Sequence, residues 1–279
     1  MRGKGLIILL STVLLAGCAS VATERMAGHL SMAMLNQSDP EIVRTGAPAY
    51  LLLVDSLITD EPDNADLLLA GSRLYGAYAA GLVEESERRR GLTDQALAYA
   101  RRALCQENEA LCAALDLPFL DFEPVLQQTD DDDLPILYGY AGAWLGSIES
   151  HSDDWSAVAD LPKAQAMLQR VVDLQPDYEL GRAQLYLGAL LALRPTALGG
   201  QPEQAREHFE QAIRYSEGRD LLAKVEYARR YARLVYDQAL HDRLLQEVLE
   251  ADPDYPGLTL SNVIAQGRAR ALLQDDYFQ

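Results

Sequence analysis

The sequence predicts an all-α protein in which pairs of amphipathic helices stack into an irregular superhelix. Ala and Leu dominate the 279 residues, and runs of β-branched residues are scarce after the first 20 positions. Apolar residues recur with the 3.6-residue period of an α-helix. The stretch 185–215 is predicted to form two helices that are joined by a tight turn. A hairpin of this kind cannot cover its own apolar face, so the rest of the chain must supply more of them.

The first residues have the layout of a secretory signal. Basic Arg2 and Lys4 precede the short apolar run 6–15, and the sequence Leu-Ala-Gly then leads to Cys18. This Cys resembles that of the bacterial lipobox, which is acylated and becomes the mature N-terminus. The alternative is an ordinary signal whose cleavage site happens to carry a Cys. We expect Cys18 to be lipidated, since several acyl chains anchor a protein stably to a membrane.

Lipidation at Cys18 divides the chain into three parts: a signal peptide (1–17), a tether and first helix (18–40), and a tetratricopeptide-like helical domain (41–279). By resemblance to lipoprotein sorting in Gram-negative envelopes, Ala19 in place of Asp favours the outer membrane, with the protein facing the periplasm. The net charge is −18 and becomes about −20 without the signal. So acidic a chain is not expected to bind nucleic acid or an anionic lipid face.

Three helices are expected in the first third of the domain. One covers 41–59 and ends before Pro62. The next covers 66–83, and the side predicted to pack closely on a neighbour carries Leu74 and three small residues: Ala70, Ala77 and Gly81. Thr93 is the predicted N-cap of the third helix, which carries Ala residues at helical spacing.

Cys105 and Cys112 lie beyond this point, in a compartment where disulfides persist. Seven residues along one straight helix would separate them by about 10 Å, too far for a bond. A disulfide therefore requires the helix to break within 107–110. The alternative is two buried thiols.

An aromatic helix follows the acidic run 130–133, which we interpret as a solvated loop capping that helix rather than a calcium loop. Tyr138, Tyr140 and Trp144 lie along this helix with glycines between them. One interpretation is core packing. The other is the wall of a groove, in which glycines leave room for a ligand.

The hairpin at 185–215 has the spacing of a tetratricopeptide unit. Leu187-Gly188 lies on its first helix, which Pro195 ends, and the second helix carries Ala205 and Phe209 at the matching positions. Units with similar endings finish near residues 62, 108, 176, 217 and 253, so the repeats are irregular. Two further helices are expected at 221–236 and 258–273.

No catalytic constellation is present in the sequence. None of the four histidines stands in a metal-spaced pair with another His or with Cys, and no phosphate loop, dinucleotide fingerprint or nucleophile elbow occurs. We therefore expect no enzyme activity, no metal and no cofactor.

Several stretches, in order over nearly the whole mature chain, resemble the lipoproteins called the T component of TRAP transporters: 137–146, 155–162, 198–209, 224–233 with Asp237, and 260–262. The chain departs from this pattern at Gln201, where Asp is expected, and at Gly139, where Trp is expected. The resemblance implies a helical protomer, a homotrimer, a periplasmic solute-binding protein as partner, and a groove for an elongated ligand.

A curved helical array presents a concave wall, and we expect Tyr138, Tyr140 and Trp144 to form part of it. Arg170 and Arg182 are the candidate contacts for an anionic group of the ligand. The predicted function is a lipid-anchored accessory protein that docks a solute-binding protein and holds or passes its ligand. The alternative is a scaffold lipoprotein for envelope assembly that binds no ligand.

Overall fold

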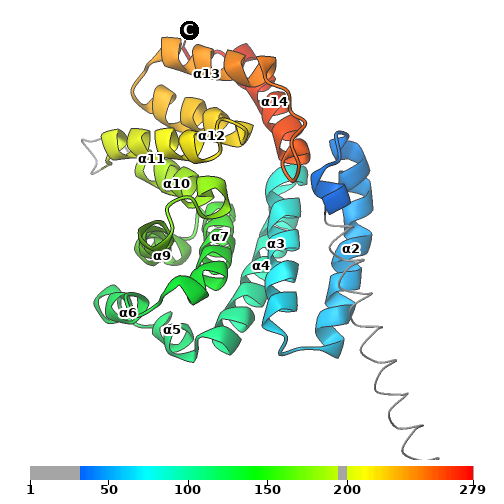
Figure 1. The fold of residues 1–279 in the computed structure, drawn as a ribbon, viewed down its shortest axis with the longest axis vertical. Coiled ribbons are helices and arrows are strands. Elements are labelled where there is room, and N and C mark those ends of the chain that lie inside the picture. The colour runs from blue at the N-terminus through cyan, green and yellow to red at the C-terminus, as the bar shows by residue number, and fades with distance from the viewer. Residues whose placement is uncertain (1–31, 194–199, 279) are drawn as a thin grey trace, which may run out of the picture.

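A computed structural model describes residues 32–193 and 200–278 (Figure 1). Every regular element in these residues is a helix, so the prediction of an all-α protein is confirmed. The signal segment, Cys18 and most of the tether lie outside the described residues, as does Pro195 in the turn of the predicted hairpin.

Three long helices form the N-terminal side: α2 (Pro40–Asp60), α3 (Ala65–Leu82) and α4 (Ser86–Glu107). Asp39 caps α2 by accepting from the Glu41 N–H, and Asn64 caps α3 by accepting from the Leu67 N–H. These ends agree with the predicted helices to within one residue.

Two local predictions in this region were wrong. Thr93 lies inside α4, and its Oγ1 donates to the helix carbonyl of Arg89 instead of capping a helix start. On α3, Ala70 and Ala77 are exposed, and the buried side instead carries Leu68, Tyr75 and Tyr78. Large rings bury more apolar area than alanines do, so they take the inward positions.

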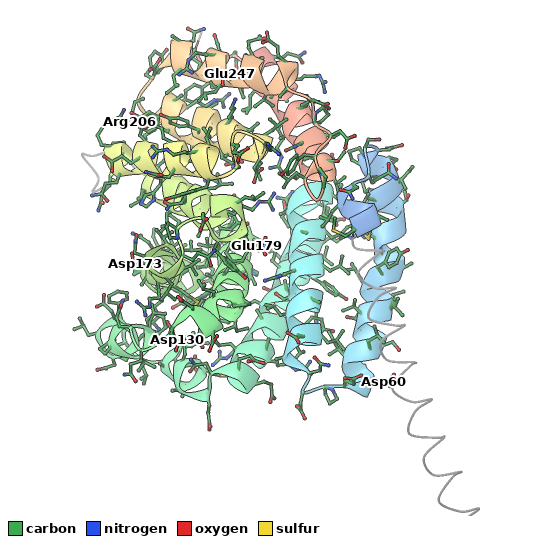
Figure 2. The ribbon with its side chains drawn as sticks, viewed as in Figure 1. Asp60, Asp130, Asp173, Glu179, Arg206 and Glu247 are labelled. Carbon is green, nitrogen blue, oxygen red and sulfur yellow. A yellow bond between two sulfur atoms is a disulfide. The ribbon has the colours of Figure 1, made fainter. Side chains whose placement is uncertain are left out.

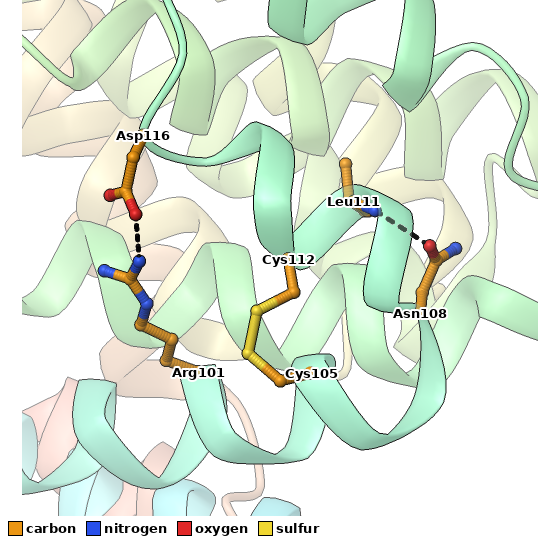
Figure 3. Close-up of a disulfide and its surroundings, with 6 residues drawn as sticks. All are labelled: Arg101, Cys105, Asn108, Leu111, Cys112 and Asp116. Atoms are coloured by element: carbon orange, nitrogen blue, oxygen red, sulfur yellow. Dashed lines mark hydrogen bonds and ion pairs between the residues drawn. A yellow bond between two sulfur atoms is a disulfide. The ribbon is translucent and has the colours of Figure 1, made fainter.

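The helix breaks at Asn108, inside the predicted window, and Cys105 and Cys112 form a disulfide with their Cα atoms 5.0 Å apart (Figure 3). Asn108 ends α4 with extended backbone and caps α5 (Glu109–Ala114) by accepting from the Leu111 N–H at 2.9 Å. The break brings the cysteines within bonding reach, which a straight helix would prevent.

The middle of the chain packs around α7 (Leu134–Ser150), which contacts α3, α4 and α9. Asp130 and Asp133 form a capping box at the short turn η1 (Asp131–Asp133), whereas α7 has no side-chain cap; the acidic run therefore caps the turn before α7 and not the helix itself. Gly139 packs against Leu69 of α3 so closely that an added Cβ would collide with it. Three shorter helices complete this part: α6 (Phe119–Leu126), α8 (Trp155–Val158) and α9 (Leu161–Leu174).

The predicted hairpin consists of α10 (Tyr178–Leu191) and α11 (Pro202–Tyr215). A Cβ at Gly188 would lie 3.0 Å from the ring of Phe209 and 3.1 Å from the Ala205 carbonyl oxygen. The helices therefore approach at the small residues that the repeat spacing singled out.

The C-terminal part returns to the N-terminal helices. It comprises α12 (Leu221–Glu226), the π-helical turn η3 (Tyr227–Ala232), α13 (Gln238–Glu250) and α14 (Thr259–Gln274). Arg268 of α14 donates to the Ala80 carbonyl of α3 at 2.8 Å, and the Gly257 N–H donates to Asn36 at 2.7 Å. Figure 1 shows α14 close to the ends of α2 and α3, so the array curls back on itself.

The apolar core divides into two clusters. The larger one spans α2 to α10, and the smaller one spans α10 to α14. Helix α10 belongs to both, since Ala183 and Leu187 pack in the first cluster and Leu185 and Leu191 in the second. The position of α10 thus determines how the two halves of the array meet.

Candidate ligand-binding site

The site residues proposed from the sequence do not form one group. Tyr140 and Trp144 contact each other in the core, and Arg170 lies apart. Tyr138 and Arg182 come together where α7 meets the start of α10. There they join Tyr178, Tyr186 and Asp220, and we call these five residues the α10 junction.

The central contact of the α10 junction is an ion pair. The Nε of Arg182 donates to the Oδ2 of Asp220 at 2.7 Å, and Asp220 is buried. Burial alone would lower the pKa of Arg182, but the carboxylate of Asp220 outweighs it, so the pKa is raised and the guanidinium stays charged. Its two outer nitrogens donate no hydrogen bond within the described chain, so they are free to contact an anionic group.

Aromatic rings form the wall beside this guanidinium. Tyr138 of α7 lies edge-on to Tyr178, with ring centroids 5.6 Å apart, and stacks on Tyr186 at 6.2 Å. Burial raises the pKa of Tyr138, so its hydroxyl remains protonated at neutral pH. Arg73 of α3 approaches Tyr178 from the other side of the array. The α10 junction therefore offers apolar surface next to one fixed positive charge.

An unusual backbone conformation begins α10. Glu179, Leu180 and Gly181 have φ values of 50°, 59° and 74°, in the left-handed region that non-glycine residues rarely occupy. A Cβ at Gly181 would lie 2.9 Å from Tyr215, so the third position requires glycine. Figure 2 labels Glu179 near the centre of the view, between the α7 and α10 side and α3. Strained backbone of this kind is frequent at binding sites.

Tyr140 and Trp144 belong to the core and not to an open wall. Trp144 is 5 % exposed, and its ring lies edge-on to Tyr140 at a centroid distance of 5.2 Å. The two side chains leave α7 on the side away from Tyr138, because residues two and six positions apart point to other faces of a helix. Of the two interpretations of the aromatic stripe, core packing applies to these two residues.

Arg170 is also placed apart from the α10 junction. Its Nε donates to the Thr129 hydroxyl at 3.3 Å, and one outer nitrogen donates to the Thr129 carbonyl. These bonds tie α9 to the segment that follows α6. Arg170 therefore has a structural role, and the anion contact proposed for it is not supported by this arrangement.

The sequence reasoning missed a charged cluster at the π-helical turn. Glu226 is buried and accepts from both Arg229 and Arg230, at 2.7 and 2.8 Å. Arg230 also reaches Glu149 of α7 at 3.1 Å, which links the two halves of the array. The spacing Glu226, Arg229, Arg230 is the i, i+3, i+4 pattern of helical ion pairs, and that signal was available in the sequence.

No cofactor or metal is implied by these groups. In residues 32–193 and 200–278, no three His, Cys, Asp or Glu side chains gather in a way that could hold a metal ion. The α10 junction itself contains three phenols, one guanidinium and one carboxylate, which can bind a ligand but include no nucleophile next to a base.

Comparison with known proteins identifies the family. A model of the TRAP transporter T-component matches residues 36–278, nearly the whole described chain. The protein belongs to this family. It is also 26 % identical over 255 residues to a protein of Treponema pallidum (strain Nichols) that is described only as uncharacterized, a match that covers 85 % of this chain and 79 % of that relative.

Membership of the T-component family gives the protein an accessory role in TRAP-type transport, and the family is not one of enzymes. Two residues from the stretches that resemble the family make contacts between helices. Phe209 is the ring against Gly188, and the buried Asn262 accepts from the Leu221 N–H at 3.0 Å and donates to the Arg219 carbonyl. At Gly139, where the resemblance predicts Trp, a Cβ would collide with the Cδ1 of Leu69, so any larger residue requires Leu69 to move.

Proposed function

We propose that this T-component docks a periplasmic solute-binding protein and holds or passes its ligand at the α10 junction. The observation that carries the proposal is the family match over residues 36–278. The aromatic wall of Tyr138, Tyr178 and Tyr186 suits an elongated apolar body, and the free nitrogens of Arg182 suit a terminal anionic group. The ligand is therefore proposed to be an amphipathic carboxylate.

The docking is tested with the mature chain, Cys18→Ser to keep it soluble, and a periplasmic solute-binding protein of a TRAP system from the same organism. Surface plasmon resonance should give saturable binding. No binding at any ligand concentration would contradict the docking proposal and favour a scaffold without ligand.

The ligand site is tested with two matched arginine variants. Arg182→Lys keeps the charge beside Asp220 but loses the planar fork that binds a carboxylate bidentately. Arg170→Lys changes a second half-buried arginine that lies outside the α10 junction. Native mass spectrometry should show less retained ligand for Arg182→Lys alone. Equal retention by both variants would place the ligand elsewhere.

The membrane anchor is proposed from the sequence of the first 18 residues. We propose that Cys18 is acylated and holds the protein at the outer membrane, facing the periplasm. Metabolic labelling with a palmitate analogue should label the wild type and not Cys18→Ala. Fractionation of the two membranes then tests the location, and label in inner-membrane fractions alone would contradict it.

We propose that the protomers associate as a homotrimer through α2. This helix contacts only α3 and α14 strongly within the described chain, and it leaves apolar side chains outward: Ile42, Ala49, Leu52 and Leu53. It is apolar and long enough to pass as a membrane span by composition, with 22 % of that window buried. No charged residue occurs from Thr45 to Val54, so two acidic copies can meet there without repulsion.

The α2 interface is tested by one substitution made at two positions. Leu52 is 71 % exposed on α2, and Leu120 is 79 % exposed on α6. Light scattering should report a trimer for the wild type and for Leu120→Glu, and a monomer for Leu52→Glu. A monomeric wild type at micromolar concentration, or a trimeric Leu52→Glu variant, would exclude this interface.

A further inference from the structure

A polar cleft of about 440 Å³ lies between α11, the π-helical turn η3 and α13, away from the α10 junction. Three carboxylates, two guanidinium groups and two tyrosine rings line it. Figure 2 labels Arg206, one of these residues, at the outer margin of the molecule. The cleft was not among the sites expected from the sequence, because its residues come from three segments of the chain.

Two tyrosines of η3 form the aromatic part of the cleft. The rings of Tyr227 and Tyr231 lie 5.3 Å apart, and Phe209 stacks beneath Tyr227 at 5.2 Å. Tyr227 donates to Glu210 at 3.3 Å. Tyr231 is only 6 % exposed, yet no group in the described chain hydrogen-bonds to its hydroxyl. The Tyr231 hydroxyl therefore reaches the cleft without a partner among the described residues and is available to a ligand.

Both guanidinium groups of the cleft are already paired with carboxylates. Arg206 pairs with Glu203 at 3.2 Å and with Glu210 at 3.7 Å on its own helix. Arg243 pairs with Glu247 at 3.1 Å, and Glu247 does not line the cleft.

The carboxylates of the cleft have fewer hydrogen-bond and ion-pair partners than they can accept. The side-chain carboxylate of Asp237 accepts a hydrogen bond only from the Leu240 N–H within the described chain, at 2.9 Å. With three carboxylates against two guanidinium groups, the lining has a net charge of −1. A ligand anion would therefore meet repulsion from the carboxylates, whereas a cation would find unoccupied carboxylate oxygens.

We propose that this cleft is a binding site for a positively charged nitrogen, either an amine or a guanidinium group. The cation would lie beside Tyr227 and Tyr231 where these two side chains line the cleft. Its N–H groups would donate to Asp237, to Glu210 and to the unpartnered Tyr231 hydroxyl. The inference goes beyond the proposed function, because it concerns a separate site and a ligand of opposite charge.

The positively charged nitrogen can belong to a small amine or to a lysine side chain of a partner protein. Calorimetric titration with n-pentylamine tests the first source, and titration with acetyl-Gly-Lys-Gly-amide tests the second. The matched neutral probes are 1-pentanol and acetyl-Gly-Gly-Gly-amide. Saturable binding of a charged probe, and not of its neutral match, supports the proposal, and the probe that binds identifies the source.

Three variants locate the binding in the cleft. Asp237→Asn keeps the helix cap of α13 but removes the charge, and Glu210→Gln removes a second carboxylate. Each should weaken binding about tenfold, the scale of one charge-assisted contact. Glu207→Gln makes the same charge change on the exposed surface of α11 outside the cleft and should leave the affinity unchanged.

Three results would overturn the proposal. One is no saturation by either charged probe up to about 10 mM, a limit weaker than typical specific sites. Another is equal binding of n-pentylamine and 1-pentanol. The third is an equal effect of Glu207→Gln and Glu210→Gln, which would indicate attraction to the acidic surface in general. Thermal unfolding of each variant by circular dichroism confirms that all are folded.

Discussion

Arg182 and Asp220 join α10 to the start of α12: the guanidinium Nε donates to the buried carboxylate at 2.7 Å. Asp220 is 2 % exposed, and its other oxygen caps α12 by accepting from the Leu222 N–H at 3.2 Å. One side chain therefore holds both the ion pair and the helix start, at the place where α10 is shared by the two apolar cores.

Two substitutions of Asp220 should destabilise the protein by different amounts. Asp220→Asn keeps the cap but leaves Arg182 without its counter-charge, and we expect a loss of about 2 kcal/mol in the free energy of unfolding. Asp220→Ala removes the cap as well, for about 1 kcal/mol more. Urea unfolding measures both. Asp116→Asn is the control, because its pair with Arg101 is exposed and should contribute under about 1 kcal/mol.

The Cys105–Cys112 disulfide closes a short loop around the break at Asn108. Replacing both cysteines by serine should lower the free energy of unfolding by about 2–3 kcal/mol, because the unfolded chain gains freedom. Thiol titration of denatured protein purified from an oxidising compartment should find neither cysteine free. Two titratable thiols, with unchanged stability in the double variant, would contradict this prediction.

Two glycines should respond to alanine in opposite directions. At Gly188 the new methyl group would press on Phe209 and on the Ala205 carbonyl, and we expect a loss of about 1–3 kcal/mol. At Gly142 of α7 nothing lies within 4 Å, so alanine should stabilise the helix by about 0.5–1 kcal/mol. Urea unfolding measures the change in the free energy of unfolding for both variants. A change of the same sign at both positions would argue against the close approach of α10 and α11.

Gln201→Asp should stabilise the protein by about 0.5–1 kcal/mol. Gln201 precedes α11 at the N-cap position, and its side chain makes no capping hydrogen bond. The shorter Asp side chain can accept from the first helical N–H groups and adds negative charge at the positive end of the helix dipole. Thermal unfolding checks this gain. Gln204→Asp, in the first turn of the same helix but past the cap, is the control and should show only the smaller gain from the helix dipole.

The stability contributed by Glu226 should depend on pH. Burial alone would raise the pKa of Glu226, but Arg229 and Arg230 outweigh it, so the pKa is lowered from 4.5. A carboxylate with a depressed folded pKa stabilises the protein above its unfolded pKa, and this contribution is lost as the pH falls through the folded value. Glu226→Gln should therefore unfold more easily than the wild type at pH 7, by about 2 kcal/mol.

The difference between Glu226→Gln and the wild type should shrink as the pH falls below 4.5. Urea unfolding of both proteins from pH 7 to pH 3 measures it. A difference that stays constant over this range would mean that Glu226 acts through packing and not through its charge.

Part of the candidate site could be predicted from the sequence, because that part depends on residue patterns within short segments of the chain. The Tyr138 and Arg182 positions were found because aromatic spacing on a helix and a nearby basic residue are visible in the chain. Tyr178, Tyr186 and Asp220 were missed, because their meeting depends on the left-handed turn at 179–181, which no periodicity signals. For Trp144, both core packing and a groove wall stayed open, because its spacing does not say which face of α7 meets other helices.

The sequence by itself determined the helical class, the hairpin at 185–215 and the place where the helix would have to break for a disulfide to form, because these depend on helical periodicity, proline, glycine and the fixed rise of a helix. The tertiary structure decided which face of each helix is buried, how α14 closes onto α3, and which charged residues meet. Those outcomes depend on competition among side chains that lie far apart in the chain, such as Arg230 with Glu149, and local patterns do not record that competition.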